Sequence, residues 1–513
     1  INISGWRLKT STSTSGAFPS YTLPADSFLI LVTSSQVTNF ASFGRVIAVP
    51  SFPAIPNDGS MLSLVAPNGS TIHAVEYTAE WYGNEVKKNG GWSLEMIDTH
   101  NPCTGINNWK ASTDANGGSP GKKNSVEGVN PDNEAPRLLR SYSNDSLTIV
   151  LVFDEPLDIP SASIASQYSI SNGLTIISAF PLSPLFNSVV LTLNAPMQRR
   201  VVYEVTANSV KDCKGNAIGV YNKSKAGWGE EAFMNDIVIN EILFNPRPNA
   251  EDFLELYNRS NKVIDASKLF IANRSSTGAI SSLKKISETA YHIYPGEYIV
   301  LTGNIPSLQM EYHVKQPSSL IPLSLPSFPD DKGIAVLLNL QGEVVDELNY
   351  DENWHFKLIS NAEGISLERL DSELPTQSKD NWHSAASTAG YATPTYQNSQ
   401  YKQMNAVGAT VEVSPKVFSP DNDGYDDVAT VSYKLNEPGY VANITIFDAS
   451  GRVVRNLVRN GSMGLRGMWR WDGLGEKNQK LPIGNYIIYT EIFNLQGKKQ
   501  QFKQVITLAR RLK

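Results

Sequence analysis

Residues Gly91–Gly121 read GWSLEMIDTHNPCTGINNWKASTDANGGSPG, and residues Gly364–Pro394 read GISLERLDSELPTQSKDNWHSAASTAGYATP. Both stretches place Ser-Leu-Glu before an Asp, and both place Asn-Trp ten residues after that Asp. Neither contains a His-Glu-x-x-His motif, a nucleophile turn or a phosphate loop. Text that recurs in this way without a catalytic motif predicts a duplicated structural unit.

The repeat extends beyond these two stretches at a constant spacing of 273 residues. The matched pairs are Leu64 and Leu337, Gly69 and Gly342, Tyr77 and Tyr350, Trp81 and Trp354, Ser93 and Ser366, Leu94 and Leu367, Glu95 and Glu368, Asp98 and Asp371, Asn108 and Asn381, and Trp109 and Trp382. We therefore expect two copies of one domain, about half a chain apart.

The text between and around these matches is typical of β-strands. Segments such as SFLILVT, SLTIVLVF, SVVLTLN, GEYIVLTG and NYIIYTEIF are short, rich in β-branched and aromatic residues, and bounded by Gly, Asn, Pro or Asp. A capped amphipathic helix of more than ten residues is hard to find. The predicted fold class is all-β, with tandem immunoglobulin-like β-sandwiches.

The composition narrows the class of protein. A net charge of −6 over 513 residues gives no electrostatic basis for nucleic-acid binding. The sequence contains no run of 18 apolar residues, so it predicts no transmembrane span. The two cysteines, Cys103 and Cys213, fall in different expected domains, so we expect no disulfide between them. The sequence starts at Ile1 without a signal peptide, and we expect a leader upstream.

The two copies differ at their starts. The second copy opens with DIVINEILFNPRPNAEDFLELYNRSN, residues Asp236–Asn261, which predicts two strands. The first copy begins directly with INISGWRL, the counterpart of the text that follows Asn261. A sandwich without those strands exposes unpaired edges and half a core, so we expect the missing strands upstream of Ile1.

Three kinds of module resemble these segments. IVINEILFNP, DFLELYN, YPGEYIVL and GISLERLD resemble the lamin-tail domain, an immunoglobulin-like sandwich of nuclear lamins and bacterial surface proteins. VFDEPLD and VKDCKGNAI look like a bacterial Ig-like domain, while PDNDGYDD, IFDASGRVVRNL and WDGLGEKNQKLPIGNY resemble the Ig-like domain of flagellar hook-capping proteins and the C-terminal modules of type IX-secreting bacteria. The expected domains are a lamin-tail-like domain lacking its first strands (1–125), an Ig-like domain (131–229), a complete lamin-tail-like domain (236–400), and a hook-capping-like domain that would serve in type IX sorting or docking (408–513).

The repeated residues have structural and functional interpretations. Trp109 and Trp382 are expected to fill the sandwich cores near the last strand. Glu95 and Glu368 are expected to accept backbone hydrogen bonds at a sheet end or to form surface salt bridges. The alternative is a ligand groove shared by both copies.

The most acidic turn is DNDGYDD, which contains Asp421, Asp423, Asp426 and Asp427. Ca²⁺ takes six to eight oxygen ligands, which such a turn can partly supply. The alternative is a turn in which the side chains bond their own backbone. Weaker calcium candidates are Asp212 with Asn216, and Asp154 with Glu155 and Asp158. No cofactor is required by the sequence, and Ca²⁺ is the only ion it suggests.

Two aromatic side chains, Tyr82 and Phe356, lie in matching loops and are expected to contact a partner. The sequence as a whole favours a non-enzymatic, exported scaffold or adhesion protein of the cell surface or outer membrane, which binds other surface or outer-membrane proteins. The alternative is a carbohydrate- or polymer-binding accessory region of a larger secreted hydrolase.

Overall fold

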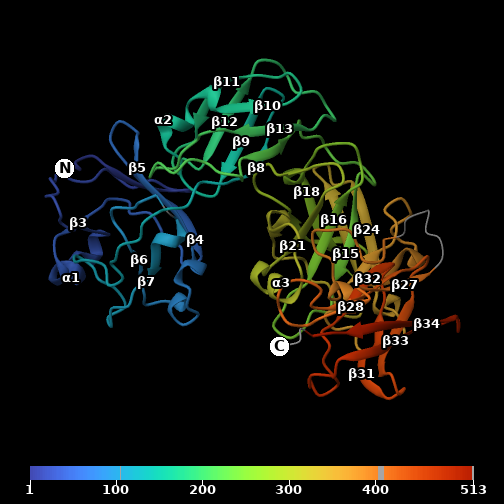
Figure 1. The fold of residues 1–513 in the computed structure, drawn as a ribbon. Helices are drawn as coiled ribbons and strands as arrows, with labels where there is room; N and C mark the ends of the chain where they lie inside the picture. The colour runs from blue at the N-terminus through green and yellow to red at the C-terminus, as the bar shows by residue number, and fades with distance from the viewer. Residues whose placement is uncertain (104, 276, 402–408, 511–513) are drawn as a thin grey trace. The chain divides into compact units, whose positions relative to one another are not determined.

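The computed structural model describes residues 1–103, 105–275, 277–401 and 409–510. Gly408 and residues 511–513, which bound the last expected domain, lie outside this range. The chain divides into two compact units, residues Ile1–Trp228 and Gly229–Lys513. Both units consist mainly of β-strands arranged as immunoglobulin-like sandwiches (Figure 1), which confirms the all-β class.

The first unit holds two sandwiches. We call the strands β1–β7 with their loops the first sandwich and β8–β14 the second sandwich. The strands of the first are β1 (Arg7–Thr10), β2 (Ile30–Val32), β3 (Val46–Ala48), β4 (Gly59–Val65), β5 (Thr71–Thr78), β6 (Leu94–Met96) and β7 (Trp109–Ala111), with helix α1 (Val37–Phe40). Those of the second are β8 (Leu138–Tyr142), β9 (Thr148–Phe153), β10 (Tyr168–Ile170), β11 (Ile176–Pro181), β12 (Ser188–Leu193), β13 (Tyr203–Ala207) and β14 (Lys223–Ala226), with helix α2 (Ile159–Ala162).

The sheets of the second sandwich are more complete than those of the first. The second sandwich packs a four-stranded sheet, β11-β12-β9-β8, against a three-stranded sheet, β10-β13-β14. Strand β12 alternates buried and half-buried residues because one of its faces covers the core. The first sandwich has one three-stranded sheet, β1-β4-β5, and two separate pairs, β2-β3 and β6-β7.

The second unit also holds two sandwiches, which we call the third and the fourth. The third comprises β15 (Ile237–Leu243), β16 (Phe253–Asn258), β17 (Ile264–Asp265), β18 (Leu269–Arg274), β19 (Ile280–Lys285), β20 (His292–Ile293), β21 (Tyr298–Thr302), β22 (Leu320–Pro322), β23 (Lys332–Asn339), β24 (Val344–Asp351), β25 (Leu367–Arg369) and β26 (Trp382–Ser384), with helix α3 (Ile305–Glu311). The fourth comprises β27 (Thr410–Ser414), β28 (Val417–Phe418), β29 (Ala429–Lys434), β30 (Tyr440–Asp448), β31 (Val453–Ser462), β32 (Arg466–Trp471), β33 (Gly484–Asn494) and β34 (Lys499–Leu508).

The third sandwich is the most completely built. A six-stranded sheet, β22-β21-β16-β15-β25-β26, faces a four-stranded sheet, β19-β18-β23-β24. Every residue of β15 is buried, as expected for a central strand whose two faces are both covered. Ile239, Leu254, Leu337, Tyr350 and Trp382 belong to one core cluster.

The duplicated text has the same strand register in both copies. In β4–β5, Leu64 pairs with His73, and in β23–β24, Leu337 pairs with Asp346, which are the positions 273 residues further on. A β-bulge follows at the same place in each pair. The first and third sandwiches can therefore be compared position by position.

Candidate functional site

Three fully buried glutamates lie side by side in the six-stranded sheet of the third sandwich. Glu241 on β15 pairs with Glu255 on β16 and with Glu368 on β25. We call these three residues the glutamate ladder. Acidic residues are rarely buried without partners, so the surroundings of the ladder decide its role.

Most of the hydrogen-bond donors to the ladder come from the segment that follows β26. The Thr393 backbone N–H donates to Glu241 at 2.9 Å, and the Thr395 N–H donates to Glu255 at 2.6 Å. The Gln400 N–H donates to Glu368 at 2.9 Å. Hydroxyl groups add further bonds to these carboxylates, from Ser366, Thr393 and Ser399. The ladder therefore fixes residues 393–400 against the sheet.

Burial and mutual repulsion change the protonation of the ladder. Burial, followed by the charge of Glu368, raises the pKa of Glu241 to about 8. Burial raises the pKa of Glu368 to about 7, and burial together with Glu241 raises the pKa of Glu255 well above its ordinary value. The ladder therefore retains a proton near neutral pH, which relieves the repulsion between adjacent carboxylates.

Glu95 of the first sandwich is the counterpart of Glu368 in the third sandwich. Its carboxylate accepts hydrogen bonds from the Ser119 hydroxyl at 2.5 Å and from the Ser125 N–H and hydroxyl at 2.7 Å. Burial alone would raise the pKa of Glu95. The hydrogen bonds from Ser119, Ser125 and Ser112 together outweigh burial, so the pKa lies below its ordinary value. Both repeated glutamates thus contact the segment that follows the last strand of their sandwich.

The repeated tryptophans differ between the copies. Trp382 is buried in the core of the third sandwich, and its indole N–H donates to the Thr376 carbonyl at 2.7 Å. Trp109 is only partly buried, and its ring centroid lies 6.3 Å from that of Trp81. The smaller enclosure of Trp109 reflects the less complete first sandwich.

Two aromatic side chains, Tyr82 and Phe356, were expected to contact a partner, but the structure buries Phe356. Phe356 is only 7% exposed and lies 5.1 Å from the His383 ring, so the expectation of a free surface ring was wrong. The loop folds back onto the sandwich because the Phe356 N–H donates to the buried hydroxyl of Ser384. Tyr82 is partly buried, and its hydroxyl donates to the Trp92 carbonyl at 2.9 Å.

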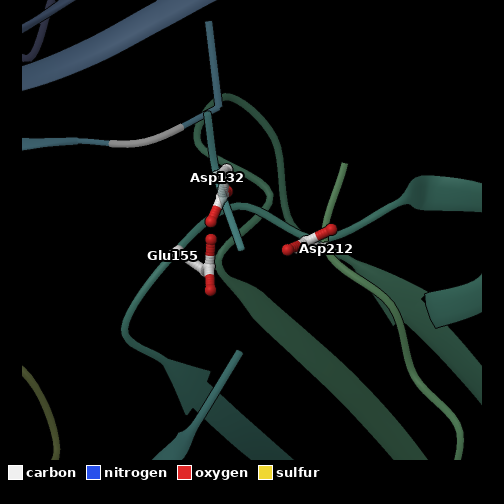
Figure 2. Close-up of side chains that lie close together, drawn as sticks. All are labelled: Asp132, Glu155 and Asp212. Atoms are coloured by element: carbon white, nitrogen blue, oxygen red, sulfur yellow. The ribbon is translucent and has the colours of Figure 1, made fainter. Parts of the chain in front are cut away.

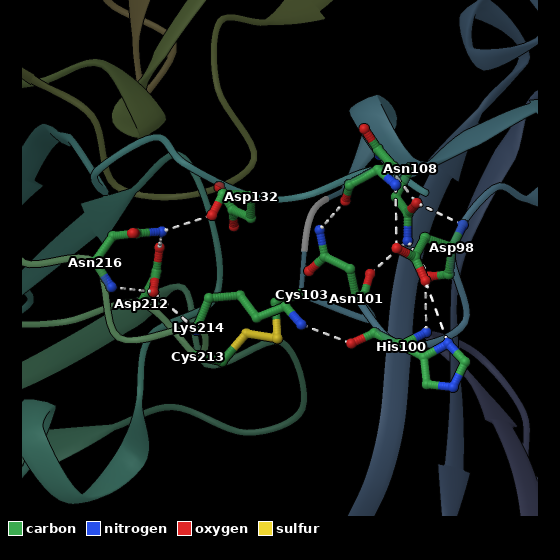
Figure 3. Close-up of a disulfide and its surroundings, with 11 residues drawn as sticks. Asp98, His100, Asn101, Cys103, Asn108, Asp132, Asp212, Cys213, Lys214 and Asn216 are labelled. Atoms are coloured by element: carbon green, nitrogen blue, oxygen red, sulfur yellow. Dashed lines mark hydrogen bonds and ion pairs between the residues drawn. A yellow bond between two sulfur atoms is a disulfide. The ribbon is translucent and has the colours of Figure 1, made fainter. Parts of the chain in front are cut away.

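A disulfide joins the first and second sandwiches (Figure 3). Cys103 and Cys213 are bonded, with their Cα atoms 6.0 Å apart, so the expectation of unpaired cysteines was wrong. The loop before β7 meets the turn after β13, a proximity created only by the packing of two neighbouring sandwiches. The ammonium of Lys214, next to Cys213, donates to the His100 carbonyl at 2.6 Å across the same junction.

Three carboxylates converge beside this disulfide (Figure 2). Asp132, Glu155 and Asp212 each offer one oxygen, and these oxygens lie within 4.8 Å of one another. Burial, followed by the charges of Asp132 and Asp212, raises the pKa of Glu155 to about 8. One oxygen of Asp132 is buried without a hydrogen-bond partner among the described residues. Such a group of carboxylate oxygens is the ligand type that Ca²⁺ prefers.

The sequence had suggested Asp212 and Glu155 as members of separate calcium candidates. The structure brings them together and adds Asp132, which no sequence motif singled out. Asp154 instead accepts from the Arg137 N–H at 2.7 Å, and Asp158 caps helix α2 by accepting from Ser161.

A cavity of about 270 Å³ adjoins the carboxylates within the first unit. Its walls include His73, Trp81 and Trp109 from the first sandwich, and Asp154 and Glu155 from the second. Aromatic faces and carboxylates together suit a ligand that has both an apolar face and hydroxyl or cationic donors.

The acidic turn of the fourth sandwich has a local structure of its own. Asp421, Asp423 and Asp427 bring one oxygen each within 4.8 Å of one another, while Asp426 is not part of this group. Asp427 accepts from the Gly424 N–H at 2.9 Å. The turn therefore forms bonds to its own backbone, and whether it also binds Ca²⁺ stays a prediction.

One part of the chain matches a known protein family. The family model of the lamin tail domain matches residues 232–352, within the third sandwich. No curated protein sequence matches the chain. No helix among the described residues is long and apolar enough to cross a membrane.

Solved structures resemble the chain only distantly. The N-terminal part of the bacterial S-layer protein SbsC is 16% identical over 33% of this chain and 40% of that protein, with a TM-score of 0.18. PorZ of Porphyromonas gingivalis, a surface component of the type IX secretion system, is 10% identical over 97% of this chain and 63% of its own, with a TM-score of 0.17. Dimeric latent PorU of the same organism is 11% identical over 75% of this chain and 33% of its own, with a TM-score of 0.16.

Proposed function

We propose that this chain is a non-enzymatic, exported scaffold of the bacterial cell surface or outer membrane that works through contacts with other surface or outer-membrane proteins. The observation that carries the proposal is the structural role of the residues in the repeated sequence. Its most chemically distinctive residues, Glu95 and Glu368, are buried and bind the chain's own segments 119–125 and 393–400. The duplication therefore serves architecture, which leaves outer loops and strand edges for binding.

The disulfide supports the proposed location. Bonds such as Cys103–Cys213 form and persist mainly in oxidising compartments, including the periplasm and the cell surface. The match of residues 232–352 to the lamin tail domain is compatible with the same location.

The proposal is tested in cells that make the full protein. Intact cells are treated with a membrane-impermeant amine label and a crosslinker, and labelled peptides and crosslinked partners are identified by mass spectrometry. We expect labelled lysines on this chain, an oxidised Cys103–Cys213 pair, and crosslinks to surface or outer-membrane proteins. Recovery of the unlabelled chain with both thiols reduced would contradict the proposal.

The fourth sandwich has a separate proposed role as a type IX sorting or docking module. The proposal rests on the hook-capping-like text of residues 408–513. A fusion of these residues to a periplasmic reporter should reach the surface in a type IX-competent host and stay periplasmic in a secretion-deficient one. A reporter that remains periplasmic in both hosts would exclude the sorting role.

The cavity at the junction of the first unit favours a second candidate, carbohydrate binding by an accessory region of a larger hydrolase. Trp81 and Trp109 offer aromatic faces, and Glu155 offers hydrogen-bond acceptors, which is the combination that sugars use. On a glycan array, we expect binding by the wild-type chain to be lost in Trp81→Ala and retained in Phe356→Leu, because Phe356 is buried elsewhere. An array without any bound glycan would exclude this candidate.

A further inference from the structure

A cavity of about 330 Å³ lies between the third and fourth sandwiches, within the second unit. One wall is the chain that leaves the third sandwich, and it includes Tyr396 and Gln397. The other wall is formed by β29 and β32 of the fourth sandwich, and it includes Lys434 and Arg466. The volume lies in the range of small-molecule sites in proteins.

The first wall is held in place from both sides. The Ser399 hydroxyl donates to Glu368 of the glutamate ladder at 2.8 Å, and the Ser399 carbonyl accepts from the Leu465 N–H, just before β32, at 2.9 Å. The Thr388 hydroxyl, which also borders the cavity, lies 2.8 Å from the Tyr433 hydroxyl on β29. Walls that are fixed before a ligand arrives lose little conformational freedom on binding.

The second wall concentrates positive charge. Lys434 on β29 pairs directly with Arg466 on β32. Residues directly opposite each other in an antiparallel pair share one face of the sheet, where like charges destabilise the pairing. None of the described carboxylates forms an ion pair with Lys434. An anion that binds between the two cations would offset their repulsion.

The first wall adds hydrogen-bonding groups. The Tyr396 hydroxyl donates to the Ala392 carbonyl over a long 3.5 Å, so it can turn toward a ligand at little cost. Burial, followed by the charge of Glu241, raises the pKa of Tyr396, so this hydroxyl keeps its proton. The carboxamides of Gln397 and Asn436 belong to exposed residues of the cavity lining. The glutamate ladder behind this wall already accepts hydrogen bonds and retains a proton near neutral pH, which weakens its repulsion of an anion.

We propose that this cavity binds a small phosphate monoester. The phosphate group lies between Lys434 and Arg466, and the organic part of the ligand contacts Tyr396 and the two carboxamides. A phosphate monoester carries a charge of about −1.5 to −2 at pH 7, which matches two cations better than the single charge of a carboxylate does. A guanidinium can donate to two phosphate oxygens, and an ammonium adds a compact positive charge.

The site is independent of the carbohydrate candidate in the first unit. The two cavities share no residue, and the carbohydrate candidate depends on the aromatic faces of Trp81 and Trp109. Failure of either binding assay therefore leaves the other candidate in place.

The test is calorimetric titration of the intact chain of residues 1–513 with two phosphate monoesters, glucose 6-phosphate and glycerol 3-phosphate. Glucose is the matched probe without the phosphate group. We expect saturable binding of at least one monoester and binding of glucose that is weaker by about tenfold or more, because charge-assisted hydrogen bonds are the strong ones. Hydrogen–deuterium exchange should show new protection at residues 396–399 and 465–467.

A matched pair of variants locates the site. Lys434→Ala removes a cation that lines the cavity, and it should weaken monoester binding by about tenfold. Arg470→Ala removes an exposed cation from the same face of β32 as Arg466, but Arg470 does not line the cavity, so binding should stay unchanged. Neither Lys434 nor Arg470 belongs to the core of the fourth sandwich, so both variants should fold.

Three outcomes would overturn the proposal. The first is that neither monoester binds, or that glucose binds as tightly as glucose 6-phosphate. The second is an equal loss of binding in Lys434→Ala and Arg470→Ala, which would indicate general attraction to a basic surface. The third is binding of citrate as tight as that of the monoesters, which would assign the cavity to carboxylates.

Discussion

Removal of the Cys103–Cys213 bond should destabilise the first unit by an amount that the chain topology sets. The two cysteines are 110 residues apart in sequence, so the bond closes a long loop in the unfolded chain. For a loop of about 100 residues, the loss of unfolded-state entropy corresponds to about 4.7 kcal/mol. Measured effects commonly reach 2–5 kcal/mol, because the reduced unfolded chain retains structure.

The assay is urea unfolding of the wild-type chain and of the double variant Cys103→Ser/Cys213→Ser. With an m-value of about 2.5 kcal/mol/M, a loss of 4.7 kcal/mol lowers the urea midpoint of the first unit by about 2 M. Hydrogen–deuterium exchange at residues 1–228 and 229–510 assigns each transition to its unit. The transition of the second unit should stay in place.

Reduced wild-type chain is the matched control, because it should unfold at the midpoint of the double variant. Two outcomes would refute the reasoning. One is a midpoint shift of the first unit below about 0.3 M, and the other is two titratable thiols per chain in the protein isolated without reductant.

Three further changes test other parts of the structure. The raised pKa of Glu241 favours its protonated form in the folded state, so the unfolding free energy of the second unit should fall as the pH rises from 4.5 to about 8, and Glu241→Gln should remove part of that fall. Glu241→Ala should lower the unfolding free energy by about 1–3 kcal/mol, because it leaves buried donors unsatisfied. Equal urea midpoints for the two variants would contradict this. Burial, and to a smaller extent the charge of His383, lowers the pKa of His355 to about 4. The unfolding free energy of the second unit should therefore fall by up to about 3 kcal/mol as the pH drops from 6.5 to about 4. Denaturant titrations at each pH should show a smaller fall over this range for His355→Gln. If the acidic turn binds Ca²⁺, calorimetric titration should give heat that disappears in Asp423→Asn/Asp427→Asn, and an unchanged heat would assign the binding to another site.

The fold class could be predicted because its signals are local. Turn residues and β-branched runs mark the strands, and the spacing of 273 residues marks the duplication. Trp382 was expected in the core because the same text occurs twice, and it lies there. Trp109 carries the same text but is less enclosed, because enclosure depends on neighbouring strands and not on the residue itself.

The sites that depend on packing could not be predicted. Cys103 and Cys213 meet only because two sandwiches pack side by side, and no spacing rule covers 110 residues. Asp132 joins Glu155 and Asp212 from a segment that carries no motif of its own. Glu241 and Glu255 could have been noticed as single acidic residues within the otherwise apolar runs IVINEIL and FLELYN.

The glutamate ladder also has a mechanical consequence. Segment 393–400 leads from the third sandwich toward the fourth, and its backbone is bound to carboxylates on three adjacent strands. Tension applied from the C-terminal side would load these bonds together before it reached the hydrophobic core. Since protonation tunes the carboxylates, the force at which this connection yields should depend on the acidity of the surrounding medium.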